Sequence, residues 1–212
     1  MSTGSSPRVI SKEVTDAVVA LGKLVLQFSR VNRGTYQEDG HTPESDTDHT
    51  VMLGIIACSF AKRCLPHLDL GKIAQFALVH DLVEAYAGDT QTLQVMTPYI
   101  KMEKEQREHS AFLRIQNEFR MLPWAADTIR EYEEKSSPEA RYVKALDKAI
   151  PKITHILNRG AAYRSSGLTQ AHAQEIYDVQ RIDMQKYAGD FPEVMELRDY
   201  LIEEVFGVVF AK

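Results

Sequence analysis

Apolar residues recur at steps of three and four through most of this chain, the spacing that places them on one face of an α-helix. No stretch of useful length alternates apolar and polar residues, as a half-buried strand would. The sequence therefore predicts an all-α protein, and Pro151 can kink the helix that begins at Pro138. Helices are expected over residues 11–28, 45–64, 70–87, 99–122, 124–134, 138–150, 169–188 and 192–210.

Length and composition favour one domain with a substantial core, because the chain has 212 residues and is 44% hydrophobic. We expect this domain to span residues 11–212, since no linker-like stretch divides it. Residues 1–10 begin as a polar segment rich in serine and are expected to be disordered. The sequence has neither a long uncharged apolar run nor a signal peptide, which predicts a cytoplasmic protein with no membrane partner.

The charge of the chain argues against a nucleic-acid polymer as partner. Its formal net charge is -5, and no basic run longer than a pair stands out. A local basic pocket for a small phosphate compound is compatible with this composition. Cys58 and Cys64 lie six residues apart, a poor span for a disulfide within a helix, and are expected to be buried free thiols.

The pair His80-Asp81 interrupts the most apolar of the predicted helices. A histidine and an aspartate buried together need partners, and one divalent metal ion would satisfy both. The dipeptide alone favours a simpler interpretation, a core histidine hydrogen-bonded to a neighbouring carbonyl group. Glu84 and Asp89 follow closely, however, so that four ionisable groups fall within ten residues of a segment that is otherwise apolar.

Two more segments place a candidate ligand in a helix. His49 lies in the first turn of the helix predicted from Ser45, and Asp147 lies within an apolar-periodic helix. Each has an alternative interpretation: His49 as a surface residue near a helix cap, and Asp147 as an exposed acid paired with Lys144 or Lys148.

The order His49, His80-Asp81, Asp147 resembles the H…HD…D signature of the HD-domain metal-dependent phosphohydrolases. Within that superfamily the chain is similar to the small 5′-deoxynucleotidase and HD-domain-containing-2 group. Residues 44–50 resemble its block E-S-V-x-D/E-H-S/T, and residues 80–89 its block H-D-x-x-E-x-x-x-G-D. Residues 132–148 resemble its block E-Y-E…E-A-x-x-V-K-x-L-D. Three ordered blocks are far more specific than any one of them.

The resemblance implies a helical HD domain in which His49, His80, Asp81 and Asp147 hold one divalent metal ion. Two imidazoles and two carboxylates suit Mn, Co, Fe or Zn, without a choice among them. The resemblance further implies that Glu84 and Asp89 position or activate water and carry protons, although a salt bridge to a nearby cation is the alternative for Glu84.

Arg30 and Arg33 precede His49 and are candidate residues for binding the substrate phosphate. In the resembled group an arginine-tryptophan pair lies near this place, whereas here Val31 follows Arg30. A solvated loop arginine is the alternative interpretation for each. The resemblance also implies that the protein forms a homodimer.

Three functions follow from these expectations. The first is a nucleotidase that hydrolyses (deoxy)nucleoside 5′-monophosphates to nucleoside and phosphate. The second is a nucleoside triphosphohydrolase or another phosphoester hydrolase of the same superfamily. The third, ranked last because all six expected metal and acid positions are intact, is a non-catalytic sensor of nucleotide or metal.

Overall fold

A computed structural model describes residues 9–90, 93 and 96–210, and the described chain is all-α apart from one short hairpin. Most of the segment expected to be disordered, residues 1–8, lies outside the described residues. The elements are α1 (Lys12–Phe28), β1 (Asn32–Tyr36), β2 (Pro43–Ser45), α2 (Asp46–Cys64), α3 (Leu70–Val79), α4 (Glu84–Ala87), α5 (Pro98–Glu118), α6 (Trp124–Glu134), α7 (Pro138–Ala149), α8 (Pro151–Leu157), α9 (Ala161–Ser166), α10 (Gln170–Ala188) and α11 (Pro192–Val209).

Side-chain caps fix where several of the predicted helices begin. Ser11 caps α1 by accepting a hydrogen bond from the backbone of Val14. At the start of α2, Ser45 and Asp48 form a reciprocal capping box, as the sequence predicts. Ser137 caps α7, whose first residue is Pro138. These short-range signals explain why the expected and observed starts agree.

The segment from residue 30 to residue 44, predicted as a loop, contains an antiparallel hairpin. Strand β1 pairs with β2, with Asn32 opposite Ser45 and Tyr36 opposite Pro43. The residues of β1 show no alternating apolar pattern that would predict a strand. Packing of β1 against α8 and α9 stabilises the hairpin. The side chain of Asn158 donates a hydrogen bond of 2.7 Å to the carbonyl oxygen of Tyr36. A partner more than a hundred residues away gives no local signal.

The helix predicted over residues 70–87 is in fact two helices joined by a turn. Helix α3 ends at Val79, residues 80–83 form the turn, and α4 begins at Glu84. The turn is tightened by bonds between residues three apart, such as Glu84 N to Asp81 O at 2.8 Å. A second break separates α7 from α8, where Pro151 cannot donate to the preceding helix.

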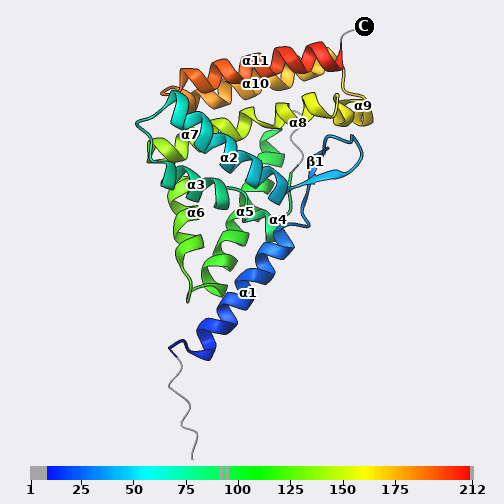
Figure 1. Ribbon diagram of the computed structural model, residues 1–212. Helices are drawn as coiled ribbons and strands as arrows, with labels where there is room; N and C mark the ends of the chain where they lie inside the picture. Colours follow the sequence, from blue (N-terminus) through cyan, green and yellow to red (C-terminus); the bar gives the residue numbers. More distant parts are fainter. Residues whose placement is uncertain (1–8, 91–92, 94–95, 211–212) are drawn as a thin grey trace, which may run out of the picture.

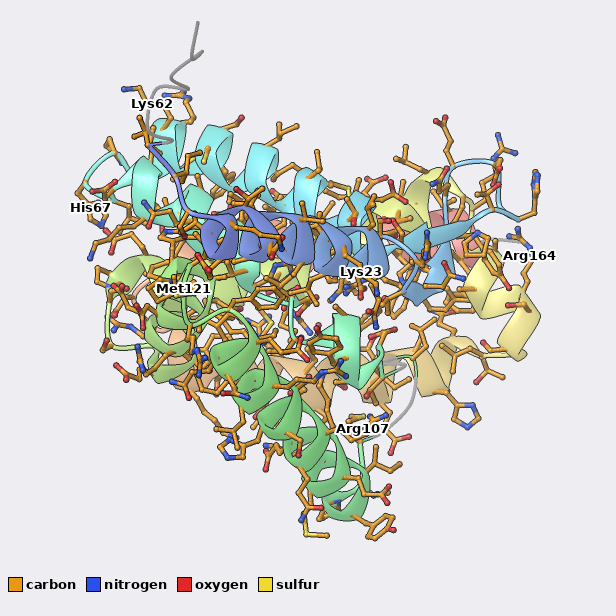
Figure 2. All side chains as sticks on the ribbon, turned by 90° about the horizontal axis from the view of Figure 1, so that it is seen from below. Lys23, Lys62, His67, Arg107, Met121 and Arg164 are labelled. Carbon is orange, nitrogen blue, oxygen red and sulfur yellow. The ribbon has the colours of Figure 1, made fainter. Side chains whose placement is uncertain are left out.

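The central core lies where α2, α3 and α7 pack together, and residues of α10 and α11 close it. Figure 1 shows α10 and α11 side by side across one end of the molecule, with α1 projecting at the other. Seen from below, α1 carries Lys23 and lies across this lower face, while α5 carries Arg107 (Figure 2). The large residues of the central core include Leu53, Phe76, Tyr142, Leu146, Met184 and Val194.

Two further expectations concern surface properties. None of the helices within the described ranges has both the length and the apolar content needed to cross a membrane. Cys58 and Cys64 are both free, but the expectation that both are buried is wrong, because Cys58 is half-buried and Cys64 is exposed. Cys64 is the last residue of α2, where the chain reaches the surface.

Candidate metal centre

Four side chains from three parts of the fold converge on one buried point. His49 comes from the first turn of α2, His80 and Asp81 from the turn after α3, and Asp147 from α7. One ligand atom of each lies within 4.8 Å of those of the other three. The packing of α3 on both α2 and α7 brings these segments together. The structure therefore gathers all four residues that the resemblance implied as ligands.

His80 has a different partner on each ring nitrogen. Its Nδ1 lies 2.8 Å from the carbonyl oxygen of Ala77, where it donates a hydrogen bond. In the neutral ring Nε2 then carries the lone pair, and this atom lies 3.0 Å from Asp81 Oδ2 and 3.7 Å from Asp147 Oδ1. This buried Nε2 has no hydrogen-bond donor among the described residues, so a metal ion would supply the missing partner.

The ring of His49 lies between two buried carboxylates. Its Nε2 lies 3.0 Å from Asp147 Oδ1, while its Nδ1 faces Glu44 Oε1 at 3.5 Å. Burial lowers the pKa of His49, but the contacts with Asp147 and Glu44 outweigh it and raise the pKa overall. Glu44 thus lies on the side of the ring away from Asp147, where metal-binding histidines commonly have an outer partner. A metal ion at Nε2 would displace the proton that this raised pKa favours.

Asp147 is held ionised by two lysines on the same helix. Its Oδ2 lies 3.1 Å from Lys148 Nζ and 3.8 Å from Lys144 Nζ, which leaves Oδ1 facing the histidines. Burial would raise the pKa of Asp147, but Lys148, His49 and Lys144 hold it well below its ordinary range. Asp147 is therefore paired with both lysines, and it is buried rather than exposed.

A second group of acids adjoins the first through Asp81. Carboxylate oxygens of Asp46, Asp81 and Glu84 lie within 4.8 Å of one another. Burial, together with the charges of Asp81, Asp46 and Asp89, raises the pKa of Glu84 to about 10, and Lys104 opposes this shift from 3.8 Å away. A divalent cation in the adjoining cluster would lower this pKa and favour the carboxylate.

Arg33 reaches the cluster, whereas Arg30 does not. Nη1 of Arg33 lies 2.9 Å from Asp81 Oδ2 and 3.1 Å from Asp46 Oδ1. Arg30 is exposed in the turn after α1, and its side chain forms no ion pair within the described ranges. The geometry therefore supports the hypothesis of a phosphate contact for Arg33 but does not support it for Arg30.

Asp89 lies at the edge of the same group. It is half-buried and follows Gly88, whose φ of 71° lets the chain turn sharply after α4. Its charge raises the pKa of both Asp46 and Glu84. Arg107, which Figure 2 shows on α5, donates a hydrogen bond of 2.6 Å to Thr90 and so holds the residue after Asp89.

Sequence reasoning missed three residues of this centre. Glu44 and Asp46 stand in the block around His49, but their acidic groups suggest only a helix start when the sequence is read alone. Asp46 is fully buried, and burial with the charge of Asp81 raises its pKa to about 6 although Arg33 acts against the shift. Lys104 belongs to a helix rich in charges, where no local pattern marks one lysine as different.

Donor type, burial and the free imidazole nitrogen of His80 together fit a divalent metal ion. Two imidazole nitrogens and two carboxylate oxygens are ligands of borderline divalent cations. The cluster could therefore bind such an ion, which would also offset the negative charge of its carboxylates.

Known proteins resemble this chain in sequence and in fold. Residues 26–188 match the family model described as HD domain. The bovine (Bos taurus) protein named 5′-deoxynucleotidase HDDC2 is 28% identical over 183 residues, which cover 82% of this chain and 79% of the relative. The zebrafish (Danio rerio) protein of the same name is 32% identical over 141 residues, covering 62% of this chain and 64% of the relative.

A solved structure shares the fold. The crystal structure of a predicted metal-dependent phosphohydrolase from Magnetospirillum magnetotacticum MS-1 superposes with a TM-score of 0.66 at 22% identity. The match covers 90% of this chain and 96% of that one. With the family match spanning most of its length and the H…HD…D residues gathered at one buried point, this chain belongs to the HD domain family.

Proposed function

We propose that this protein is a metal-dependent phosphohydrolase that releases orthophosphate from (deoxy)nucleoside 5′-monophosphates. The observation that carries the proposal is the convergence of His49, His80, Asp81 and Asp147, with Glu84 and Arg33 beside them. Relatives named 5′-deoxynucleotidase, which match over most of their length, support this substrate class.

Each residue of the centre has a role in this proposal. His49, His80, Asp81 and Asp147 would hold the divalent ion, which supplies charge neutralisation and a more acidic water when bound. Arg33 contacts a phosphate oxygen, because its guanidinium lies beside the cluster with 16% of its side chain exposed.

Glu84 and Asp89 carry the protons. One of them orients the attacking water and accepts its proton while a new bond forms between water oxygen and phosphorus. The bond between phosphorus and the 5′ oxygen breaks, and the other acid donates a proton to that oxygen. The products are a nucleoside with a free 5′ hydroxyl group and orthophosphate.

One observation favours a second candidate, a nucleoside triphosphohydrolase. Lys144 and Lys148 lie next to Asp147, so the centre has more cationic groups than a single phosphate requires. A longer polyphosphate would use these extra charges.

Phosphate release from a panel of nucleoside mono- and triphosphates tests both candidates. The protein is stripped of metal and resupplied with Mn, Co, Fe or Zn, and the products are separated by chromatography. Orthophosphate from monophosphates alone would support the nucleotidase, and the most active metal would indicate the native ion. Triphosphate released from a nucleoside triphosphate would favour the second candidate. No turnover by metal-loaded protein would contradict both.

We also propose a cytoplasmic location and a homodimer. The two free cysteines accord with a reducing compartment. Exposed apolar residues on α1 give a second copy a surface to cover, and light scattering of the purified protein tests this assembly. These residues are Val18, Val19, Val25 and Leu26.

A further inference from the structure

Asp46 meets Arg33 because of how the hairpin enters α2. Asn32 in β1 lies opposite Ser45 in β2, and Arg33 and Asp46 are each one residue away from this pair. Arg33 continues β1, whereas Asp46 leaves the hairpin and begins α2. The backbone N–H of Asp46 donates to the carbonyl oxygen of Val31 at 3.0 Å, which closes the base of the hairpin. The position of Asp46 relative to Arg33 is therefore set by backbone pairing as well as by charge.

A buried carboxylate at this position costs folding free energy. Asp46 has no exposed surface, so its charge is removed from water when the chain folds. The first turn of α2 already has its cap from Ser45 and Asp48, so Asp46 is not needed to begin the helix. The close cation partner of Asp46 in the described structure is Arg33, with Nη1 at 3.1 Å from Oδ1.

Asp81 alone would hold Arg33 poorly in the working protein. Asp81 Oδ2 contacts both Arg33 Nη1 and His80 Nε2, so this oxygen belongs to the group that would hold the metal ion. A divalent cation there would draw on the same carboxylate charge and repel the guanidinium. Asp46 lies outside the four-residue cluster around the histidines, in the adjoining group with Asp81 and Glu84, so its carboxylate stays available to Arg33 when the first cluster holds its ion.

We propose that Asp46 is a positioning residue for Arg33. It anchors Nη1 beside the loaded metal centre, so that the remaining N–H donors of the guanidinium face the phosphate group of the substrate. The inference rests on the proposed function in one respect, the contact between Arg33 and phosphate. It predicts that Asp46 affects phosphate binding through Arg33 and does not hold metal.

The first test measures binding of orthophosphate to the manganese-loaded protein through paramagnetic broadening of its ³¹P resonance. Asp46→Asn keeps the shape of the side chain without its charge, and Asp46→Val removes its polar group. We expect the dissociation constant of orthophosphate to rise about tenfold or more in Asp46→Val and less in Asp46→Asn, with manganese content unchanged. Asp48→Asn is the matched control, because it perturbs the same turn without touching Arg33, and should leave phosphate binding unchanged.

A double-mutant cycle separates positioning from a general structural effect. In an Arg33→Gln background, Asp46→Val should change the dissociation constant of orthophosphate by less than about twofold, because its route of action is gone. With deoxyadenosine 5′-monophosphate as substrate, Asp46→Asn should raise KM more than it lowers kcat. A structural role would instead weaken binding equally in both backgrounds.

Several outcomes would overturn the inference. These are unchanged phosphate binding in folded, metal-loaded Asp46 variants, an equal loss in the Arg33→Gln background, and no phosphate binding by the wild type. Loss of one of two bound metal equivalents in Asp46→Asn would make this residue a ligand instead. The titration also separates the two proposals: a wild type that releases no phosphate from nucleotides refutes the proposed function, yet orthophosphate binding still decides the role of Asp46.

Discussion

The sequence offers two alternative interpretations of His80, a core histidine hydrogen-bonded to a carbonyl group or a metal ligand. The structure is compatible with both at once. The hydrogen bond to Ala77 is what a buried core histidine requires, and it is this bond that leaves Nε2 free to face Asp81 and Asp147. The order of the motifs predicts that these residues act together. It cannot predict the outer contacts, because the approach of Glu44 to His49 depends on the exact path of the hairpin into α2.

Glu84→Gln tests the proton-carrying role. The variant should retain its metal ion, since Glu84 lies outside the four-residue cluster, and its kcat should fall by about 10²- to 10⁴-fold. Metal content and turnover are measured on the same preparation. Glu108→Gln is a matched control, because Glu108 contacts the same Lys104 at 3.2 Å without reaching the centre. Wild-type turnover in metal-loaded Glu84→Gln would refute the role.

Glu44→Gln tests the orientation of His49. Loss of the carboxylate opposite Nδ1 should weaken metal affinity about 10- to 100-fold, as measured by competition with a chelating dye. Glu139→Gln is the comparison, because Glu139 is also buried but accepts its hydrogen bond from the backbone of Asp69. That variant should lose stability and keep its affinity for metal. Equal affinities in all three proteins would contradict the outer role of Glu44.

Helix boundaries divide into those that local sequence predicts and those it does not. Caps at Ser11, Ser45 and Ser137 involve neighbours within three residues, so the sequence contains the whole signal. The break after Val79 occurs in a segment that is apolar apart from His80 and Asp81, and the turn at 80–83 presents these two residues to the metal centre. Helix α9, between Gly160 and Gly167, is too short to show a periodic pattern.

These two glycines provide a matched test of packing between elements. Both have a positive φ, 70° at Gly160 and 67° at Gly167. A Cβ atom at Gly160 would lie 2.5 Å from Cγ2 of Val209 in α11, whereas one at Gly167 would meet nothing within 4 Å. Gly167→Ala should cost about 1 kcal/mol of unfolding free energy, and Gly160→Ala about 2–4 kcal/mol. Equal costs in urea denaturation would show that α11 does not constrain this turn.

His155 in α8 should make the free energy of unfolding depend on pH. Burial, with a smaller contribution from the charge of Lys152, lowers the pKa of His155 to about 3. The unfolded chain binds a proton at His155 near pH 6.5, whereas the folded chain binds it only near pH 3. The free energy of unfolding is therefore at its full value above pH 6.5 and falls as the pH drops from 6.5 toward 3. In denaturant titrations between pH 7.5 and 4.5, His155→Gln should remove a slope of at most about 1.4 kcal/mol per pH unit.

The control for this slope is His172→Gln. His172 is exposed on α10 and stays in contact with water in both states, so its replacement should leave the pH dependence unchanged. Identical slopes in wild type and His155→Gln would mean that the buried imidazole does not couple folding to pH.

The complete centre depends on the assembly of the fold. Its ligands come from α2, from the turn after α3 and from α7, which approach one another only when the central core forms. Periodicity predicts the helices but not their crossing, and here the ordered motifs supply the missing information. Contacts that involve no motif residue, such as Lys104 with Glu84, remain beyond such reasoning because they depend on how α5 packs.

Because the ligands bridge these elements, metal removal should destabilise the entire protein. A ligand at about 100 times its dissociation constant adds about 2.7 kcal/mol of stability, which corresponds to a rise in Tm of roughly 5–10 °C for a chain of this size. Differential scanning calorimetry with and without a chelator measures the shift. His80→Ala should show no such shift, whereas the exposed His41→Ala should behave like the wild type.

The distance along the chain between His49 and Asp147, 98 residues, also sets an order in time. A ribosome adding about 5–20 residues per second completes the last ligand roughly 5–20 s after the first. During that interval the nascent chain displays two imidazoles and one carboxylate of an unfinished centre. The full set of ligands therefore exists only after α7 has emerged, when Asp147 and its two lysines complete the centre.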